Sequence, residues 1–224
     1  MLKRKIHTQK TTRYFVSGED CKSIDTIWIV LHGYGQLADE FLSNFDCLLE
    51  GRSMVVAPEG MHRFYLKGFQ GKVGASWMTK IDREDDIFDY INELEDVYNY
   101  VIKGLDQNNV KINLLGFSQG SATACRWAAF APKKFSNLIL CSGVLPTGTD
   151  YTEWISISQE VTLYFLYGHR DPIIDKHLLE EQLSHLKKIG VKYNKIGFKG
   201  THTIDEYSLK MLKDLMNKDQ GLFG

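Results

Sequence analysis

Residues 110–120 of the chain read VKINLLGFSQG, which is the most informative stretch for the fold class. It joins an apolar, β-branched run to the pattern Gly-x-Ser-x-Gly, in which Ser118 is the central serine. Residues 121–131, SATACRWAAFA, follow and are rich in alanine, the strongest helix former. This order predicts a strand, a tight turn and a helix, and it makes Ser118 a candidate nucleophile whose hydroxyl projects above the end of a sheet.

Strand-like and helical patterns alternate along the rest of the chain. The expected strands are residues 26–31, 53–57, 110–115, 137–141, 161–167 and 191–198. The expected helices are 85–105, a segment capped by Asp175 and ended by Gly190, and 204–216. Because continuous apolar strands that alternate with helices form parallel sheets, the sequence predicts an α/β fold with a mostly parallel central sheet and helices on both faces.

The organisation of the chain is expected to be simple. No internal repeat or linker divides residues 1–224, so the sequence predicts a single domain. Residues 5–17 alternate weakly and are expected to form an antiparallel edge hairpin. No insertion is long enough to form a large lid domain.

Composition excludes several classes of function. The formal net charge is -1 and no stretch clusters Lys and Arg, so nucleic acid is not expected as a partner. No apolar run follows the basic N-terminus as a signal peptide requires, which predicts a cytoplasmic protein without stable membrane insertion. The four cysteines lie far apart and are expected to be buried, reduced thiols; they are Cys21, Cys47, Cys125 and Cys141.

A nucleophilic serine needs an imidazole to accept its proton. His202 follows the last expected strand and precedes the last helix. A general base is expected in a loop at this end of the sheet, so His202 is the predicted general base. His177 and His185 fall on a charged helix surface and are expected to be solvated. His169 follows the strand at 161–167 but precedes the best candidate acid.

The third group of such a site is a carboxylate that holds the imidazole in the right tautomer. Asp171 and Asp175 both follow the strand at 161–167. Asp175 is placed to cap the next helix, whereas Asp171 is held by Pro172, so Asp171 is the predicted acid. The alternative for Asp171 is a turn-forming Asp-Pro pair.

Residues 32–35 read HGYG and end the strand at 26–31. A turn at this place is where a second backbone donor for an oxyanion is expected, and the N–H of Tyr34 would join that of Gln119. His32 is predicted to be a structural hydrogen-bonding residue of this turn.

The long connection at residues 58–80 is expected to contribute to substrate binding. It carries more apolar surface than a solvated loop needs, including Phe64, Trp77 and Met78. Together with Val144 and Ile173 on neighbouring loops, these side chains are expected to line an open slot for short to medium acyl chains. The alternative is a loop that folds onto a small apolar cluster of its own.

Four motifs occur in the order LHGYG, GFSQG, GHRDPII and GTHTI. With them the chain resembles the carboxylesterase/phospholipase family, which includes acyl-protein thioesterases and small bacterial serine esterases. The resemblance implies an α/β-hydrolase fold, with Ser118, Asp171 and His202 as the catalytic triad. It also implies that the backbone N–H groups of Tyr34 and Gln119 form the oxyanion hole.

The chain departs from acyl-protein thioesterases at residues 75–79 (ASWMT) and at Val144, and resembles a bacterial carboxylesterase subgroup there. The predicted function is hydrolysis of a small-molecule carboxylic ester through an acyl-enzyme intermediate, without a cofactor or a metal ion, by a monomer or homodimer. Alternatives are a lysophospholipase or acyl thioesterase that uses the same triad, and a non-catalytic binding protein that keeps the fold.

Overall fold

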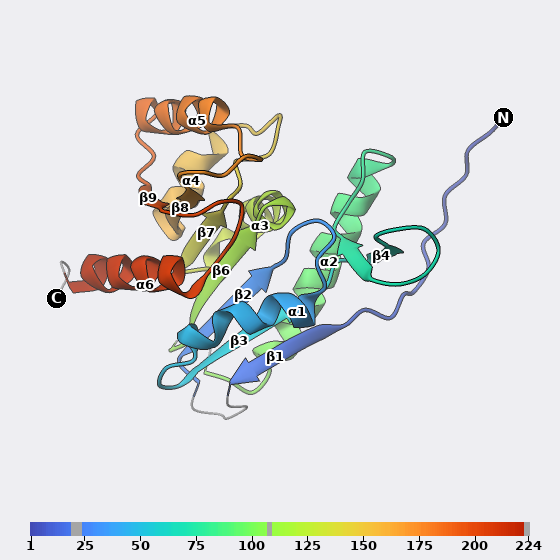
Figure 1. Cartoon of the computed structure of the whole chain (residues 1–224), viewed down its shortest axis with the longest axis horizontal. Coiled ribbons are helices and arrows are strands. Elements are labelled where there is room, and N and C mark those ends of the chain that lie inside the picture. Colours follow the sequence, from blue (N-terminus) through green and yellow to red (C-terminus); the bar gives the residue numbers. More distant parts are fainter. Residues whose placement is uncertain (19–23, 107–108, 222–224) are drawn as a thin grey trace.

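The computed structural model describes residues 1–18, 24–106 and 109–221, which are built around one large sheet (Figure 1). Its strands are β1 (Tyr14–Gly18), β2 (Thr26–Leu31), β3 (Ser53–Pro58), β6 (Lys111–Phe117), β7 (Asn137–Cys141), β8 (Thr162–Gly168) and β9 (Asn194–Phe198). Their spatial order is β1-β3-β2-β6-β7-β8-β9. Every neighbouring pair is parallel except β1 with β3, so the mostly parallel sheet predicted from the sequence is confirmed.

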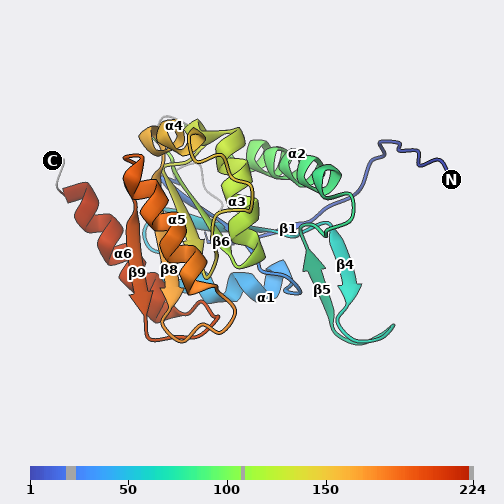
Figure 2. The same cartoon turned by 90° about the horizontal axis from the view of Figure 1, so that it is seen from above.

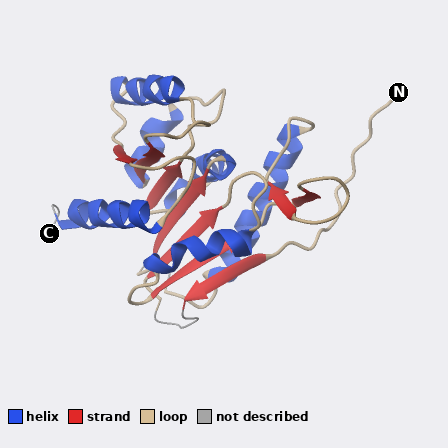
Figure 3. Ribbon diagram, viewed as in Figure 1, coloured by secondary structure: helices blue, strands red, loops and turns tan. Residues whose placement is uncertain are grey.

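Helices cover both faces of this sheet (Figure 3). They are α1 (Ala38–Leu42), α2 (Arg83–Val101), α3 (Gln119–Phe130), α4 (Glu153–Glu160), α5 (Lys176–Lys188) and α6 (Glu206–Gly221), with short 3-10 helices η1 (Ser43–Leu48) and η2 (Pro132–Lys134). Ile27 and Ile29 of β2 pack toward the core that α2, α3, α4 and α5 share. Trp28 and Val30 point the other way, into a second core with α1, η1 and α6. Side chains alternate along a strand, so an all-apolar strand such as β2 supplies both cores.

The N-terminal edge of the sheet differs from the expected hairpin at residues 5–17. A single strand, β1, pairs with β3, as in the pair Phe15 and Ala57, and residues 1–13 form no helix or strand. Residues 5–13 are strongly polar, and a hairpin also needs a tight turn that this segment lacks. Two lysines of the extended N-terminal segment instead form ion pairs near the start of α2, Lys3 with Asp82 and Lys5 with Asp85.

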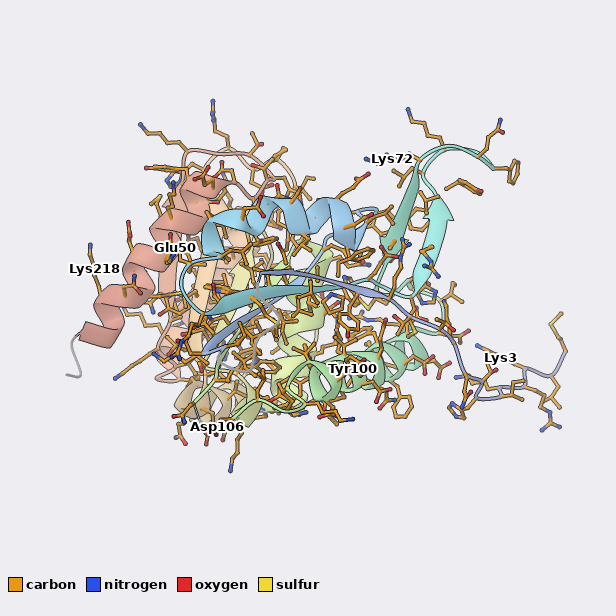
Figure 4. All side chains as sticks on the ribbon, turned by 90° about the horizontal axis from the view of Figure 1, so that it is seen from below. Lys3, Glu50, Lys72, Tyr100, Asp106 and Lys218 are labelled. Atoms are coloured by element: carbon orange, nitrogen blue, oxygen red, sulfur yellow. The ribbon has the colours of Figure 1, made fainter. Side chains whose placement is uncertain are left out.

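The connection at residues 58–80 contains two short strands that the sequence patterns did not separate. β4 (His62–Tyr65) and β5 (Val73–Ser76) pair antiparallel as a ribbon beside the main sheet (Figure 2). The ribbon stands away from the body of the molecule with Lys72 beside its tip (Figure 4).

Helix boundaries follow the capping chemistry of the sequence. α2 begins at Arg83, two residues before the expected start, and its first turn carries Glu84, Asp85 and Asp86 beside the positive end of the helix dipole. The carboxylate of Asp175 caps α5 by accepting a hydrogen bond from the N–H of Leu178 at 3.0 Å.

Two of the four cysteines have the buried, reduced thiols that were expected from the sequence. Cys125 and Cys141 are free and buried, and burial raises the pKa of each thiol strongly. Cys47 is free but only half-buried, so the prediction of burial is wrong for it, and Cys21 lies outside the described residues. Within the described ranges, no helix is long and apolar enough to cross a membrane.

Candidate active site

Ser118 stands between β6 and α3 in a strained turn. Its backbone has φ +54° and ψ −115°, a combination that non-glycine residues rarely adopt. The two flanking glycines permit the turn. A Cβ on Gly116 would lie 2.2 Å from the carbonyl oxygen of Gly120, and a Cβ on Gly120 would lie 2.2 Å from that of Leu31. The Gly-x-Ser-x-Gly pattern therefore reflects the close approach of α3 to β6 and β2.

Three side chains from distant parts of the chain form one hydrogen-bonded line. The Oγ of Ser118 lies 2.9 Å from Nε2 of His202. The Nδ1 of the same imidazole lies 2.8 Å from Oδ2 and 3.0 Å from Oδ1 of Asp171. The ring of Phe117 packs against the imidazole, with ring centres 5.1 Å apart. The structure thus brings the three residues predicted as a triad together in the order that proton transfer requires.

The surroundings of Asp171 stabilise the charged form of its carboxyl. Burial acts to raise the pKa of its carboxyl, but hydrogen bonds to the carboxylate outweigh burial, so the pKa is lowered below its ordinary value. Oδ1 accepts from the backbone N–H of Ile173 at 2.9 Å and of Ile174 at 3.1 Å. Both oxygens also face the imidazole of His202. A negative carboxylate in this place can fix the tautomer of the ring and stabilise its cationic form.

The rejected candidates lie where the sequence placed them. Asp175 caps α5 and its carboxylate is bonded to Leu178. His177 is exposed on α5, and His185 is exposed with its ring on Tyr151, at 4.3 Å between ring centres. His169 is exposed and its ring packs edge-on against Tyr167.

The site lies at the point where the strand order reverses. In the sheet, β2 lies between β3 and β6. The chain passes from β2 to β3 on one side and later returns to β6 on the other side of β2, where Leu31 of β2 pairs with Gly116 of β6. The turn that contains Tyr34 and the turn at Ser118 follow the carboxyl ends of these two strands. Ligands of open α/β sheets bind at such a switch point. Among the described residues, no hydrogen bond uses the backbone N–H of Tyr34 or of Gln119, so both remain available to an oxyanion.

His32 is a structural residue of the turn at 32–35. Its Nε2 accepts a hydrogen bond from the N–H of Gly60 at 3.0 Å, so the proton resides on Nδ1, which donates to the carbonyl of Gly33 at 2.8 Å. Burial lowers the pKa of the imidazole, which favours this neutral form. The indole N–H of Trp77 donates to the carbonyl of His32 at 2.8 Å, and the two rings pack together.

The predicted slot residues are placed in three different environments. Trp77 is 0% exposed and belongs to the core, so its indole does not line an open slot. Met78 and Val144 are half-buried and pack against that core from the surface side. Phe64 is half-buried on β4 with its ring against Tyr34, whereas Ile173 is 68% exposed.

The side chain of Gln119 has a role that sequence reasoning missed. Its Oε1 accepts from the N–H of Trp77 at 3.1 Å, and its Nε2 donates to the carbonyl of Met78 at 3.0 Å. The same amide exchanges hydrogen bonds with the hydroxyl of Ser76. Gln119 thereby ties the end of β5 to the turn that carries Ser118. A polar side chain beside the nucleophile was the only signal in the sequence.

Comparison with known proteins defines the family. The model of the phospholipase/carboxylesterase family matches residues 15–219, and the chain belongs to this family. No curated protein matches the chain in sequence.

Solved structures show the same fold. An acyl-protein thioesterase 2 of Zea mays is 17% identical, with 93% of this chain and 99% of that chain covered and a TM-score of 0.70. A carboxylesterase of Bacillus cereus is 15% identical, with 92% and 94% covered and a TM-score of 0.67. A carboxylesterase of Mesorhizobium loti is 15% identical, with 92% and 94% covered and a TM-score of 0.66. The chain therefore has the α/β-hydrolase fold that the motifs predicted.

Proposed function

We propose that the protein hydrolyses carboxylic esters through an acyl-enzyme intermediate, with Ser118 as nucleophile. The observation that carries the proposal is the continuous line from the Ser118 hydroxyl through His202 to Asp171, at 2.9 Å and 2.8 Å. Membership of the phospholipase/carboxylesterase family supports it.

In the proposed reaction, Oγ of Ser118 attacks the ester carbonyl carbon while Nε2 of His202 takes the hydroxyl proton. The tetrahedral oxyanion receives hydrogen bonds from the N–H groups of Tyr34 and Gln119. The C–O bond to the alcohol then breaks, and the alcohol leaves with the proton from His202. Water, deprotonated by His202, attacks the acyl-enzyme and releases the acid and free Ser118.

The test uses 4-nitrophenyl butyrate and a fluorophosphonate that labels activated serines. Wild type is expected to turn over the ester and to be labelled. Ser118→Ala is expected to lose about 10⁶-fold in kcat, as other triad enzymes do, and to lose the label. Ser121→Ala is the matched control, because the Ser121 hydroxyl donates to the carbonyls of Gly116 and Cys141 within the fold. Turnover and labelling that survive Ser118→Ala would contradict the proposal.

The acyl chain is proposed to lie in a slot beside Phe64, Met78 and Val144. Because the part of the chain that the structure describes holds no large lid to enclose a long chain, short to medium acyl groups are the proposed substrates. Each methylene that enters the slot should improve kcat/KM by at most about 0.8 kcal/mol. A 4-nitrophenyl ester series from acetate to palmitate is expected to rise and then level off, with an earlier plateau in Phe64→Ala. A steady rise through palmitate would contradict the slot.

A further inference from the structure

A hollow of about 400 Å³ lies between the start of α2, the second half of α3, residues 146–150 and the start of α4. Figure 2 shows α2, α3 and α4 on the same side of the sheet. Two arginines line it, Arg83 on α2 and Arg126 on α3. Its volume is in the range of sites that hold small organic molecules.

Both guanidinium groups lack a carboxylate partner within the described ranges, where other exposed and half-buried cations do form ion pairs. The Nε of Arg83 is buried and has no hydrogen-bond partner among the described residues. Arg126 uses one nitrogen, which contacts the hydroxyl of Tyr90 at 3.3 Å and the carbonyl of Ala122 at 3.4 Å. Two half-buried arginines with unused donors form a typical site for a carboxylate or phosphate group.

Three carboxylates also line the hollow, but they are placed differently. Glu84, Asp150 and Glu153 are exposed, so water screens their charges. The carboxylate of Asp150 accepts hydrogen bonds from the N–H and hydroxyl of Thr152, at 2.9 Å and 2.6 Å. The arginines are deeper than these carboxylates.

Met78, a residue of the proposed acyl slot, contacts Arg126 in the lining of the hollow. The sulfur of Met78 lies 3.8 Å from a guanidinium nitrogen of Arg126, and its carbonyl is bonded to the side chain of Gln119. Arg126 lies on α3 about two turns beyond Ser118, a rise of about 12 Å. Its contact with Ala122 shows that the guanidinium points back toward the nucleophile. Ile87, Ala129 and Trp154 add apolar surface to the wall of the hollow.

We propose that Arg83 and Arg126 bind an anionic group at the far end of the acyl chain, so that the preferred substrates are esters whose acyl part carries a terminal carboxylate or phosphate. This inference rests on the proposed ester hydrolysis. It adds a second anchoring point, separated from the scissile carbonyl by an apolar chain that passes Met78.

The test compares mono-4-nitrophenyl suberate with 4-nitrophenyl octanoate, which share chain length and leaving group and differ in the terminal carboxylate. Wild type is expected to favour the suberate ester at least tenfold in kcat/KM, about the effect of one charge-assisted hydrogen bond. Arg83→Gln and Arg126→Gln should each lower this preference about tenfold, and Arg126→Lys should restore part of it. Arg52→Gln is the charge-matched control, because Arg52 pairs with Asp25 away from the hollow. A preference for the octanoate ester in wild type, or a preference that neither variant changes, would overturn the proposal.

Calorimetry separates this proposal from ester hydrolysis itself. Suberate and octyl phosphate are titrated into Ser118→Ala, alone and combined with Arg83→Gln or Arg126→Gln. At least tenfold weaker binding in both arginine variants supports the anion site even if neither ester is hydrolysed. The tighter of the two probes identifies carboxylate or phosphate as the favoured group. Equal binding by all variants, or no binding of either probe, refutes the site.

Discussion

Two buried carboxyls of the molecule, Asp171 and Glu93, have pKa values that are shifted in opposite directions. Each residue is 5% exposed. The pKa of Asp171 is lowered, because hydrogen bonds from two backbone N–H groups and from His202 outweigh burial. The pKa of Glu93 is raised to about 8, because burial dominates there and the Glu59 carboxylate adds to it against the opposing charges of Lys10 and Arg63.

The donors around each group explain the difference. Glu93 lies on α2, and its Oε1 accepts one hydrogen bond, from the hydroxyl of Thr12. Its Oε2 has no hydrogen-bond partner among the described residues. Asp171 lies just beyond β8, where two successive N–H groups of a turn converge on Oδ1. Burial alone therefore neutralises a carboxyl, and convergent donors are what keep one charged for chemistry.

Among changes at the carboxyls, the largest expected effect follows removal of the charge at Asp171. Asp171→Asn should lower kcat about 10⁴-fold, because an amide no longer holds the productive tautomer of His202. The measurement is the rate of butyrate ester hydrolysis at saturating substrate. Asp175→Asn is the control and should keep this rate within about threefold of wild type, since Asn caps a helix as well as Asp. The reverse order of the two variants would assign the acid to Asp175.

The next effect concerns stability and its dependence on pH. The folded state holds a proton on Glu93 up to about pH 8, whereas the unfolded chain loses it near the ordinary value of 4.5. The folded state therefore binds more protons in this window, and the free energy of unfolding falls as pH rises through it. Glu93→Gln should remove this loss, a difference on the order of 4 kcal/mol at pH 8.5 relative to pH 5.

Urea unfolding of wild type and Glu93→Gln at pH 5 and pH 8.5 measures that difference. Asp171 contributes with the opposite sign, since its lowered pKa gives stability that is present at neutral pH and is lost only as pH falls below about 3.8. Parallel stability curves for the two proteins would mean that Glu93 is charged in the folded state.

The smallest expected effect concerns a carboxylate that is exposed. Asp175→Ala should lower the free energy of unfolding by about 1 kcal/mol, because the N–H of Leu178 loses its capping acceptor. Urea unfolding at pH 7 measures it, with the rate of ester hydrolysis as the companion readout. If the rate of ester hydrolysis falls by more than the loss of stability can explain, the result would show that α5 positions Asp171.

Much of the architecture could be predicted because it depends on local chemistry. All-apolar strands specify a sheet covered on both faces, and Gly116 and Gly120 are the residues that the crowded backbone around Ser118 tolerates. Motif order located Ser118, Asp171 and His202 correctly as neighbours in space. The polar segment at 5–17 misled the prediction of a hairpin, because weak alternation without a turn does not specify strand pairing.

Local sequence patterns suffice to place the parallel strands of the sheet, the turn at Ser118 and the residues at the strand ends, since each depends on neighbours a few positions away. Packing between distant elements makes Trp77 a core residue, leaves Oε2 of Glu93 without a hydrogen-bond partner among the described residues, and brings Arg83 and Arg126 to one hollow. Burial and charge pairing depend on which distant elements pack together. That packing is set by the whole set of contacts, and no local pattern of residues records it.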